Sequence, residues 1–105
     1  MDTISKRLKT LSELSENWDG YNGSAPLPAC IQNTETLLKL LGSKYTDNLD
    51  PEDIGPTPYG TIDIDWGNIS VEVGFNACDV LIKGDPLETQ NDFLEIIKIF
   101  KLNFK

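Results

Sequence analysis

The stretch that decides the fold is Ile62-Asp63-Ile64-Asp65-Trp66-Gly67-Asn68-Ile69-Ser70-Val71-Glu72-Val73. Apolar and polar residues alternate strictly on both sides of Gly67-Asn68, which is the pattern of two strands that each bury one face. A glycine at the first position of a two-residue connection predicts a type II′ hairpin turn. This turn pairs Ile62 with Val73, so the sequence predicts an antiparallel hairpin whose isoleucines and valines face the core.

A third strand is expected over residues 78–82, where inward-facing apolar residues again occupy every second position. The same register places Asp63, Glu72 and Asp79 in one row across the outward face of the three strands. Like charges directly opposed on a sheet are destabilising, so a row of carboxylates that also has Asp65 beside it predicts a partner-binding face. The alternative is an ordinary sheet face in contact with water.

Two helices are expected before these strands. Apolar residues recur at helical spacing in residues 3–17, and Trp18 adds an anchor at the end of that helix. A second helix begins at Pro28, a residue that suits the first helical position, and its apolar face extends to about Tyr45. Residues 46–58 contain Asp, Asn, Gly and three prolines and are expected to form a loop. The two helices are therefore predicted to form a hairpin.

A third helix is expected after the strands. Asp85-Pro86-Leu87-Glu88 matches a helix start with an N-cap, a proline at the first position and a glutamate at the third. Apolar residues at helical spacing continue from there, although residues 98–105 also fit an irregular edge strand. The expected architecture is one α+β domain, residues 1–105, in which an N-terminal helical hairpin and a C-terminal helix pack on a three-stranded antiparallel β-meander.

The segment from Asn17 to Pro26 carries two large aromatic residues and cannot be regular structure, because Gly20 permits positive φ and Pro26 blocks a helix. In a structural interpretation, the ring of Trp18 folds under the loop and the loop sets the angle of the helical hairpin. The scaffold residues would then be Trp18, Asp19, Gly20 and Pro26. In a functional interpretation, Tyr21 belongs to an aromatic protein-binding hot spot, with Tyr59 beside it.

Catalysis and metal binding find little support. The chain has no histidine, which excludes mechanisms that need a histidine base or ligand. The loop from Asn17 superficially resembles a calcium loop, but the twelfth residue is Pro28 instead of the required glutamate. An open sheet face also offers no water-excluding pocket that would separate the pKa values of its carboxylates. We therefore expect no enzymatic activity, no cofactor and no metal.

The charge distribution indicates the kind of partner. The net charge is -8, and no lysine or arginine occurs between Lys44 and Lys83. An acidic surface of this kind repels phosphate backbones, so direct nucleic-acid binding is not expected and a basic protein partner is. A cluster on the loop before the strands adds to this surface or holds a hard cation; the alternative is a solvated linker. Its residues are Asp47, Asp50, Glu52 and Asp53.

Length and composition set the remaining bounds. A chain of 105 residues suits one unaided core. No apolar run is long enough to cross a bilayer and residues 1–7 lack the apolar core of a secretory signal, so we expect a cytoplasmic protein without membrane contact. Cys30 and Cys78 have apolar neighbours and no Cys-x-x-Cys spacing, which predicts buried free thiols.

Two segments together resemble a group of small bacterial proteins. These are Trp18-Asp19-Gly20-Tyr21, followed by a proline, and the segment from Pro56 to Trp66, which fit a W-D-G-Y turn and a P-T-P-x-G-x-I-x-x-x-W strand entry. The resemblance covers the N-terminal two thirds of the chain and implies an architecture, without an activity or site residues. Asn22 looks inserted relative to that pattern, and Asp65 stands where glutamate is usual.

These observations predict a non-catalytic acidic protein that neutralises a basic protein partner, as an antitoxin or an immunity or anti-defence inhibitor does. Fast and salt-sensitive association is expected of such a pair. The alternative is a homodimer or an assembly subunit, joined through the aromatic loop and the apolar C-terminal segment.

Overall fold

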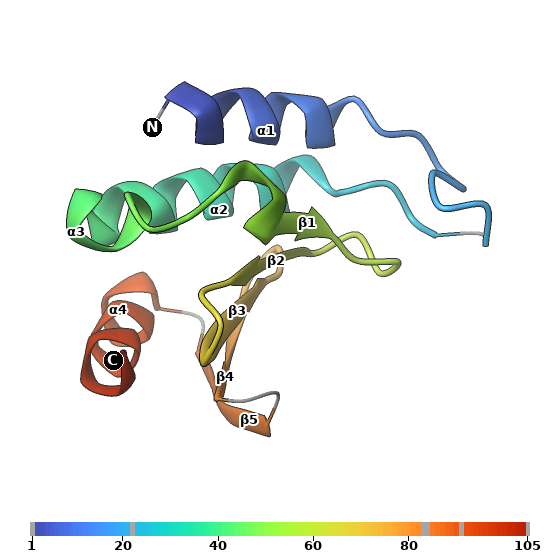
Figure 1. The fold of residues 1–105 in the computed structure, drawn as a ribbon. Coiled ribbons are helices and arrows are strands. Elements are labelled where there is room, and N and C mark those ends of the chain that lie inside the picture. Colours follow the sequence, from blue (N-terminus) through green and yellow to red (C-terminus); the bar gives the residue numbers. More distant parts are fainter. Residues whose placement is uncertain (1, 22, 83–84, 91, 105) are drawn as a thin grey trace.

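A computed structural model describes residues 2–21, 23–82, 85–90 and 92–104. The α+β class is the one predicted (Figure 1). The elements in chain order are α1 (Asp2–Ser12), α2 (Pro28–Leu41), α3 (Ser43–Thr46), a short 3-10 helix η1 (Pro51–Asp53), β1 (Ile54–Pro56), β2 (Ile62–Asp65), β3 (Ile69–Val73), β4 (Cys78–Ile82), β5 (Asp85–Gln90) and α4 (Phe93–Asn103).

The strands form one antiparallel sheet in the order β1-β2-β3-β4-β5, so each strand pairs with its neighbours in the chain. The predicted hairpin register is confirmed, because Ile62 pairs with Val73. The turn also has the predicted geometry: Gly67 takes a φ of +99°, and the Trp66 amide donates to the Ile69 carbonyl at 2.9 Å. Alternation and turn chemistry therefore specify the same pairing, which leaves the apolar positions facing inward.

The sheet has five strands, so the prediction of three was wrong. Residues 85–90 form β5 and do not begin a helix. Pro86 is compatible with this position because β5 is an edge strand, where one side of the backbone needs no ladder hydrogen bond. The other added strand, β1, lies in residues expected to form a loop; its Gly55 and Pro56 give no strand signal, and it exists through pairing with β2. Of the residues that also fitted an edge strand, 98–103 are helical.

The helices begin and end differently from the prediction. The first helix was expected to reach residue 17, but α1 ends at Ser12. Beyond that point the chain enters a loop in which Asn17 takes a φ of +63° and its amide donates to the Gly23 carbonyl at 2.7 Å. The second helix stops at Leu41, because Gly42 takes a φ of +87° before α3 begins.

The helices cover one face of the sheet, as Figure 1 shows. In that view α1 and α2 run side by side in opposite directions along one end of the sheet, as a hairpin, and α4 lies beside β4 and β5. The core fills the space between the helices and the inner sheet face. Its strand residues are Ile54, Ile62, Ile64, Ile69, Val71, Val73, Cys78 and Val80, and its main helix residues are Ile4, Leu8, Leu11, Cys30, Leu37, Leu38, Leu41, Ile96, Ile97 and Phe100.

Aromatic side chains fix α4 against the rest of the core. Phe100 is fully buried, and its ring lies 4.5 Å from that of Trp66 and 5.3 Å from that of Tyr45. Phe104 adds an edge contact to Tyr45 at 5.0 Å. The Trp66 indole also donates a hydrogen bond to the Tyr45 carbonyl at 3.1 Å, which satisfies its polar atom within an apolar cluster.

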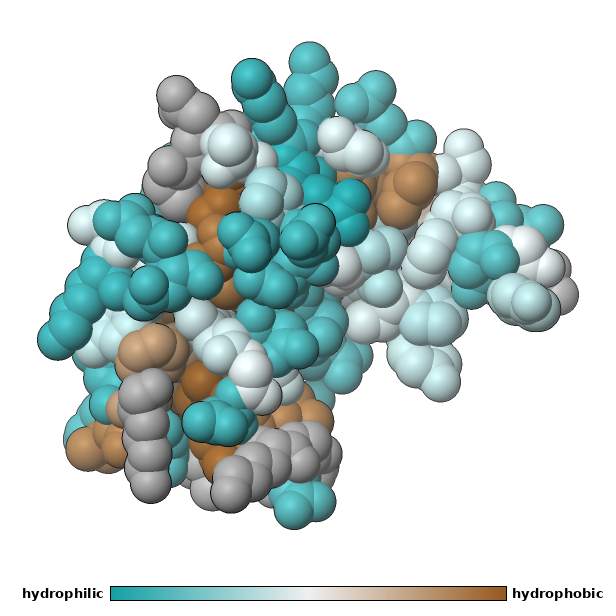
Figure 2. Space-filling view, in the orientation of Figure 1, coloured by the Kyte–Doolittle hydropathy of each residue, from teal (hydrophilic) through white to brown (hydrophobic). Residues whose placement is uncertain are grey.

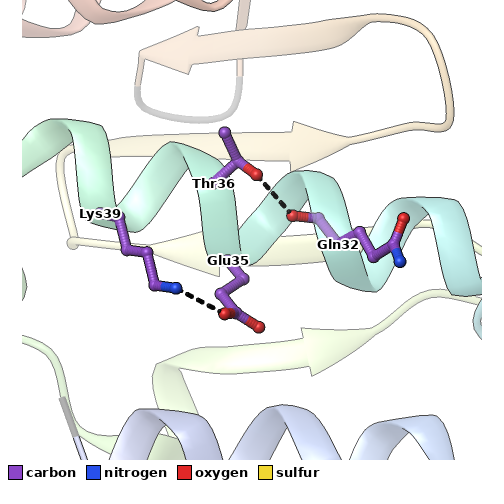
Figure 3. Close-up of polar contacts among 4 residues, drawn as sticks. All are labelled: Gln32, Glu35, Thr36 and Lys39. Carbon is purple, nitrogen blue, oxygen red and sulfur yellow. Dashed lines mark hydrogen bonds and ion pairs between the residues drawn. The ribbon is translucent and has the colours of Figure 1, made fainter.

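The outer face of α2 carries mostly polar side chains. Figure 3 shows Lys39 in an ion pair with Glu35 at 2.8 Å, and Thr36 donating to the Gln32 carbonyl one turn earlier. Both charged side chains are well exposed, so the pair stabilises the helix by only a few tenths of a kcal/mol. Within the described part of the chain, no helix has both the length and the apolar character needed to cross a bilayer.

Candidate partner-binding surface

Two loops that are far apart in the sequence lie side by side and project from the molecule. We call them the arm, which consists of residues 17–21, 23–27 and 57–61. The Ser24 amide donates to the Pro58 carbonyl at 2.8 Å, and the Leu27 amide donates to the Gly60 carbonyl at 2.9 Å. Ser24 and Tyr59 thus form a parallel bridge, which confirms that Tyr59 lies beside the loop of Tyr21. The arm protrudes at the right of Figures 1 and 2.

The first loop of the arm is held by Asp19. One carboxylate oxygen of Asp19 accepts hydrogen bonds from the Tyr21 amide at 2.8 Å and the Gly23 amide at 2.9 Å. These two amides hold the pKa of Asp19 below its usual value, because they favour the ionised form. Gly23 packs so closely that an added Cβ would lie 2.5 Å from the Asp19 carboxylate. Gly20 takes a φ of +77°, as expected for a glycine in this turn.

Trp18 closes the same loop. Its indole nitrogen donates to the Ser24 carbonyl at 2.8 Å, and its ring is half-buried and lies outside the main hydrophobic core. Pro26, further along the loop, is buried. Trp18, Asp19 and Pro26 are therefore structural residues of the arm. They stabilise the shape of the loop more than they anchor the end of α1.

The tyrosines of the arm point into solvent. Tyr21 is 88% exposed and Tyr59 is 79% exposed. Leu27, which contacts the position of Gly60 across the two loops, is 43% exposed. Exposed tyrosines on an ordered loop are typical of protein-binding surfaces, because a large ring is presented with little loss of conformational freedom on binding.

The sheet face that the helices leave open carries the acidic row. Asp63 pairs with Glu72 and Glu72 pairs with Asp79, as the hairpin register predicts, and all three side chains are half-buried. Partial burial raises the pKa of Asp63 above its usual value, and the nearby charges of Asp65 and Glu72 raise it further. Asp65 is exposed at the end of β2, where its carboxylate accepts a hydrogen bond from the Gly67 amide at 2.7 Å.

Hydroxyl groups connect the arm to this row. Thr61 donates to a Glu72 carboxylate oxygen at 2.7 Å, and the Thr57 and Thr61 hydroxyls are 2.6 Å apart. A carboxylate only accepts hydrogen bonds, so the Thr61 hydroxyl uses its proton to donate to Glu72. The Thr57 hydroxyl is therefore the donor in its bond with Thr61. The Tyr59 amide in turn donates to the Thr57 oxygen at 3.2 Å. A directed chain of hydrogen bonds therefore runs from the backbone of Tyr59 to the carboxylate of Glu72.

The two threonines were missed in the sequence analysis. Thr57 and Thr61 lie four residues apart across a turn, which is a weak signal that their hydroxyls meet. Nothing local indicates the bond from Thr61 to Glu72, because it depends on the pairing of β2 with β3. The bond from Thr61 to Glu72 could have been predicted from one pattern. A hydroxyl residue directly precedes one strand, and the neighbouring strand carries a carboxylate.

The acidic residues of the loop before the strands lie apart from the acidic row of the sheet. Asp50, Glu52 and Asp53 lie at or within η1, where the Asp53 carboxylate accepts a hydrogen bond from the Asp50 amide at 2.9 Å. This element contacts α1 and leads directly into the edge strand β1. The structure therefore sets these carboxylates at the border of the sheet and outside the row formed by Asp63, Glu72 and Asp79.

A small pocket of about 130 Å³, partly open to solvent, lies between α2, the β3–β4 turn and the start of α4. Its single charged lining residue is Asp92, whose carboxylate accepts a hydrogen bond from the Leu94 amide at 2.9 Å. The amide of Asn33, another lining residue, donates to the carbonyls of Gly74 and Phe75. The Asn33 amide and the Asp92 carboxylate are thus engaged in holding the fold.

Among the residues that the structure describes, no group of three or more His, Cys, Asp or Glu side chains is placed to hold a metal ion. The carboxylates of the row lie on the sheet face that the helices leave open. Comparison with known proteins adds no identity: no protein-family model matches the chain, and neither a curated protein nor a solved structure gives a significant match.

Proposed function

We propose that this protein binds a basic protein partner through the open face of its sheet and inhibits that partner without catalysis. An antitoxin, an immunity protein or an anti-defence inhibitor acts in this way. The observation that carries the proposal is the row of Asp63, Glu72 and Asp79, in which each carboxylate stands opposite another on the face without helices. Opposed like charges reduce the stability of a sheet, and a basic partner removes that cost when it binds.

The charge pattern supports the same partner class. The sequence has no lysine or arginine between Lys9 and Lys39 or between Lys44 and Lys83, so the arm and β1–β4 contain none. A surface with one sign of charge attracts a partner of the opposite sign over several ångströms and repels nucleic acids. A positively charged protein is therefore the macromolecule that this surface fits best.

The test is affinity capture from the source cells with the wild-type chain and with a variant that neutralises the row. That variant carries Asp63→Asn, Glu72→Gln and Asp79→Asn, which keep the side-chain shapes. We expect the wild-type chain to retain a basic protein at low salt, and to release it as the ionic strength rises past 0.1 M, where charges are screened over about 10 Å. We expect the row variant to retain none of it.

A matched control variant neutralises three exposed carboxylates elsewhere, through Glu13→Gln, Glu16→Gln and Glu95→Gln. It changes the net charge by the same amount and leaves the row intact, so it should retain the partner. Equal loss of the partner in both variants would show that net charge alone governs binding. Retention by the row variant at low salt would refute the proposed site.

A further inference from the structure

The arm presents its two tyrosines in a fixed arrangement. Two backbone hydrogen bonds join its loops, and the indole of Trp18 and the carboxylate of Asp19 hold the first loop from within. Tyr21 and Tyr59 nevertheless expose most of their surface. When a partner contacts these rings, little conformational entropy is lost in ordering the loops. This is the property of a preorganised recognition site.

The arm and the acidic row belong to one surface. The chain of hydrogen bonds from the Tyr59 amide through Thr57 and Thr61 ends on Glu72, so the loop that carries one exposed ring is bonded to the middle carboxylate of the row. Thr61 also directly precedes β2, the strand that contributes Asp63. A ligand segment that lies along the row therefore ends beside the loop that carries Tyr59.

The two kinds of group on this surface select the same side chain. Tyrosine faces attract a cation, and more often an arginine than a lysine, since the planar guanidinium stacks on the ring. Carboxylates pair with guanidinium groups through two parallel hydrogen bonds, whereas a lysine ammonium meets them as a point charge. Charge complementarity thus favours a basic segment, and the exposed rings favour arginine within it.

We infer that the arm and the acidic row together bind an arginine-bearing segment of a protein partner, with guanidinium groups on Tyr21 and Tyr59 and beside the row. This inference rests on the proposed function and adds the chemistry of the partner. The row supplies attraction to any basic segment, and the arm supplies the preference for arginine over lysine.

The test compares two synthetic peptides of equal length and charge, one alternating arginine with serine and the other alternating lysine with serine. Their dissociation constants for the purified chain are measured by calorimetry at one low ionic strength. Two cation–π contacts at exposed sites raise the affinity for a basic peptide by roughly five- to thirtyfold, and since lysine also binds tyrosine faces, the preference for the arginine peptide is expected to be a part of this factor. In a variant with Tyr21→Leu and Tyr59→Leu, we expect this preference to vanish because the affinity for the arginine peptide falls more than that for the lysine peptide.

Control variants separate the rings from other effects. Tyr21→Phe with Tyr59→Phe keeps both rings and should keep the preference for arginine. Phe75→Leu removes a 63% exposed aromatic ring outside the arm and should also leave it unchanged. Because all three positions are exposed, the variants are expected to fold, and circular dichroism checks that they do.

The outcomes distinguish the two proposals. If the wild-type chain binds both peptides equally, or if the leucine variant keeps the preference, the arm does not read arginine and this inference is wrong, while the proposed function stands. If the variant that neutralises the row binds both peptides as well as wild type does, the proposed function fails. If the wild-type chain binds neither peptide, both proposals fail.

Discussion

Asp63 is a half-buried carboxylate whose nearest acidic neighbours are Asp65 and Glu72. Burial disfavours its ionised form first, and the two neighbouring charges add to that effect, so its pKa lies above the ordinary value of 3.8. A group with a raised pKa in the folded state binds its proton earlier there than in the unfolded chain. Its negative charge therefore lowers the free energy of unfolding at neutral pH, and this cost is relieved as the pH falls through the folded-state pKa.

We accordingly predict that Asp63→Asn stabilises the protein at pH 7, by roughly 0.3 to 1 kcal/mol, the range for opposed like charges on a sheet. The gain should shrink as the pH falls toward 3.8 and disappear below it. Urea unfolding of wild type and variant at several pH values measures this. Asp47→Asn, at an exposed loop position, is the control and should show no such gain. A loss of stability at pH 7 would mean that the Asp63 charge has a favourable partner in the folded state.

Trp18 acts through one hydrogen bond to the Ser24 carbonyl and lies outside the main core. We predict that Trp18→Phe loosens the arm and leaves the domain folded, because the ring remains while its donor is lost. The global cost should not exceed about 1.5 kcal/mol. Hydrogen exchange should accelerate at the Ser24 and Leu27 amides, which bond to the neighbouring loop, and stay unchanged at Ile96 in α4. Acceleration at Ile96 as well would show that Trp18 supports the whole fold.

At the scale of elements, α4 depends on its first residues. Asp92 is the N-cap, and its carboxylate accepts a hydrogen bond from the Leu94 amide at 2.9 Å. We predict that Asp92→Ala lowers the free energy of unfolding by about 1 kcal/mol, whereas Asp92→Asn, which keeps the acceptor, costs only a few tenths. Thermal or urea unfolding of the two variants compares them directly. Equal losses in both would mean that the charge of Asp92 matters more than its hydrogen bond.

The hairpin of β2 and β3 was predictable because its signals are local. Alternation gives the inward face, and the Gly67 turn gives the register, so the row of Asp63, Glu72 and Asp79 followed from the sequence. A helix was wrongly predicted to start at Asp85-Pro86-Leu87-Glu88 because that prediction also used local signals, and the local pattern fits a helix start. Pairing with the free edge of β4 outweighed that pattern, and no local signal shows that the edge is available. The true cap, Asp92, lies further along the chain.

At the scale of the whole molecule, the sequence predicted which face of the sheet is acidic but not what borders it. The contact between the loops of the arm joins residues more than thirty positions apart, and the threonine link to Glu72 depends on the pairing of β2 with β3. The apolar C-terminal segment, the other surface considered for self-association, is largely used inside the molecule. Phe100 is buried, and Leu94 and Leu102 are its exposed large apolar residues among those described, at 70% and 77%. Sedimentation of the purified chain across concentrations tests the remaining case for a homodimer.

Cys78 is 4% exposed and lies beside Phe93 and Ile96 in the wall of the pocket. Burial raises its pKa to about 11, so little thiolate forms at pH 8, and its low exposure beside α4 hinders the approach of alkylating reagents. We predict that an alkylating reagent modifies Cys78 in the native protein at a rate set by transient opening of this end of the molecule. In Asp92→Ala that rate should rise about fivefold if the cap contributes about 1 kcal/mol to the closed state. Mass spectrometry resolves modification of Cys78 from that of Cys30.

The two thiols therefore provide a built-in probe of how the domain opens. Cys30 is fully buried in α2, and Cys78 lies in β4 near the start of α4, so the order in which they are labelled reports the order in which the domain opens. Earlier labelling of Cys78 would mean that α4 detaches while α1 and α2 remain on the sheet. Simultaneous labelling would mean that the molecule opens as a single unit, and that its lifetime in the cell is governed by one global unfolding rate.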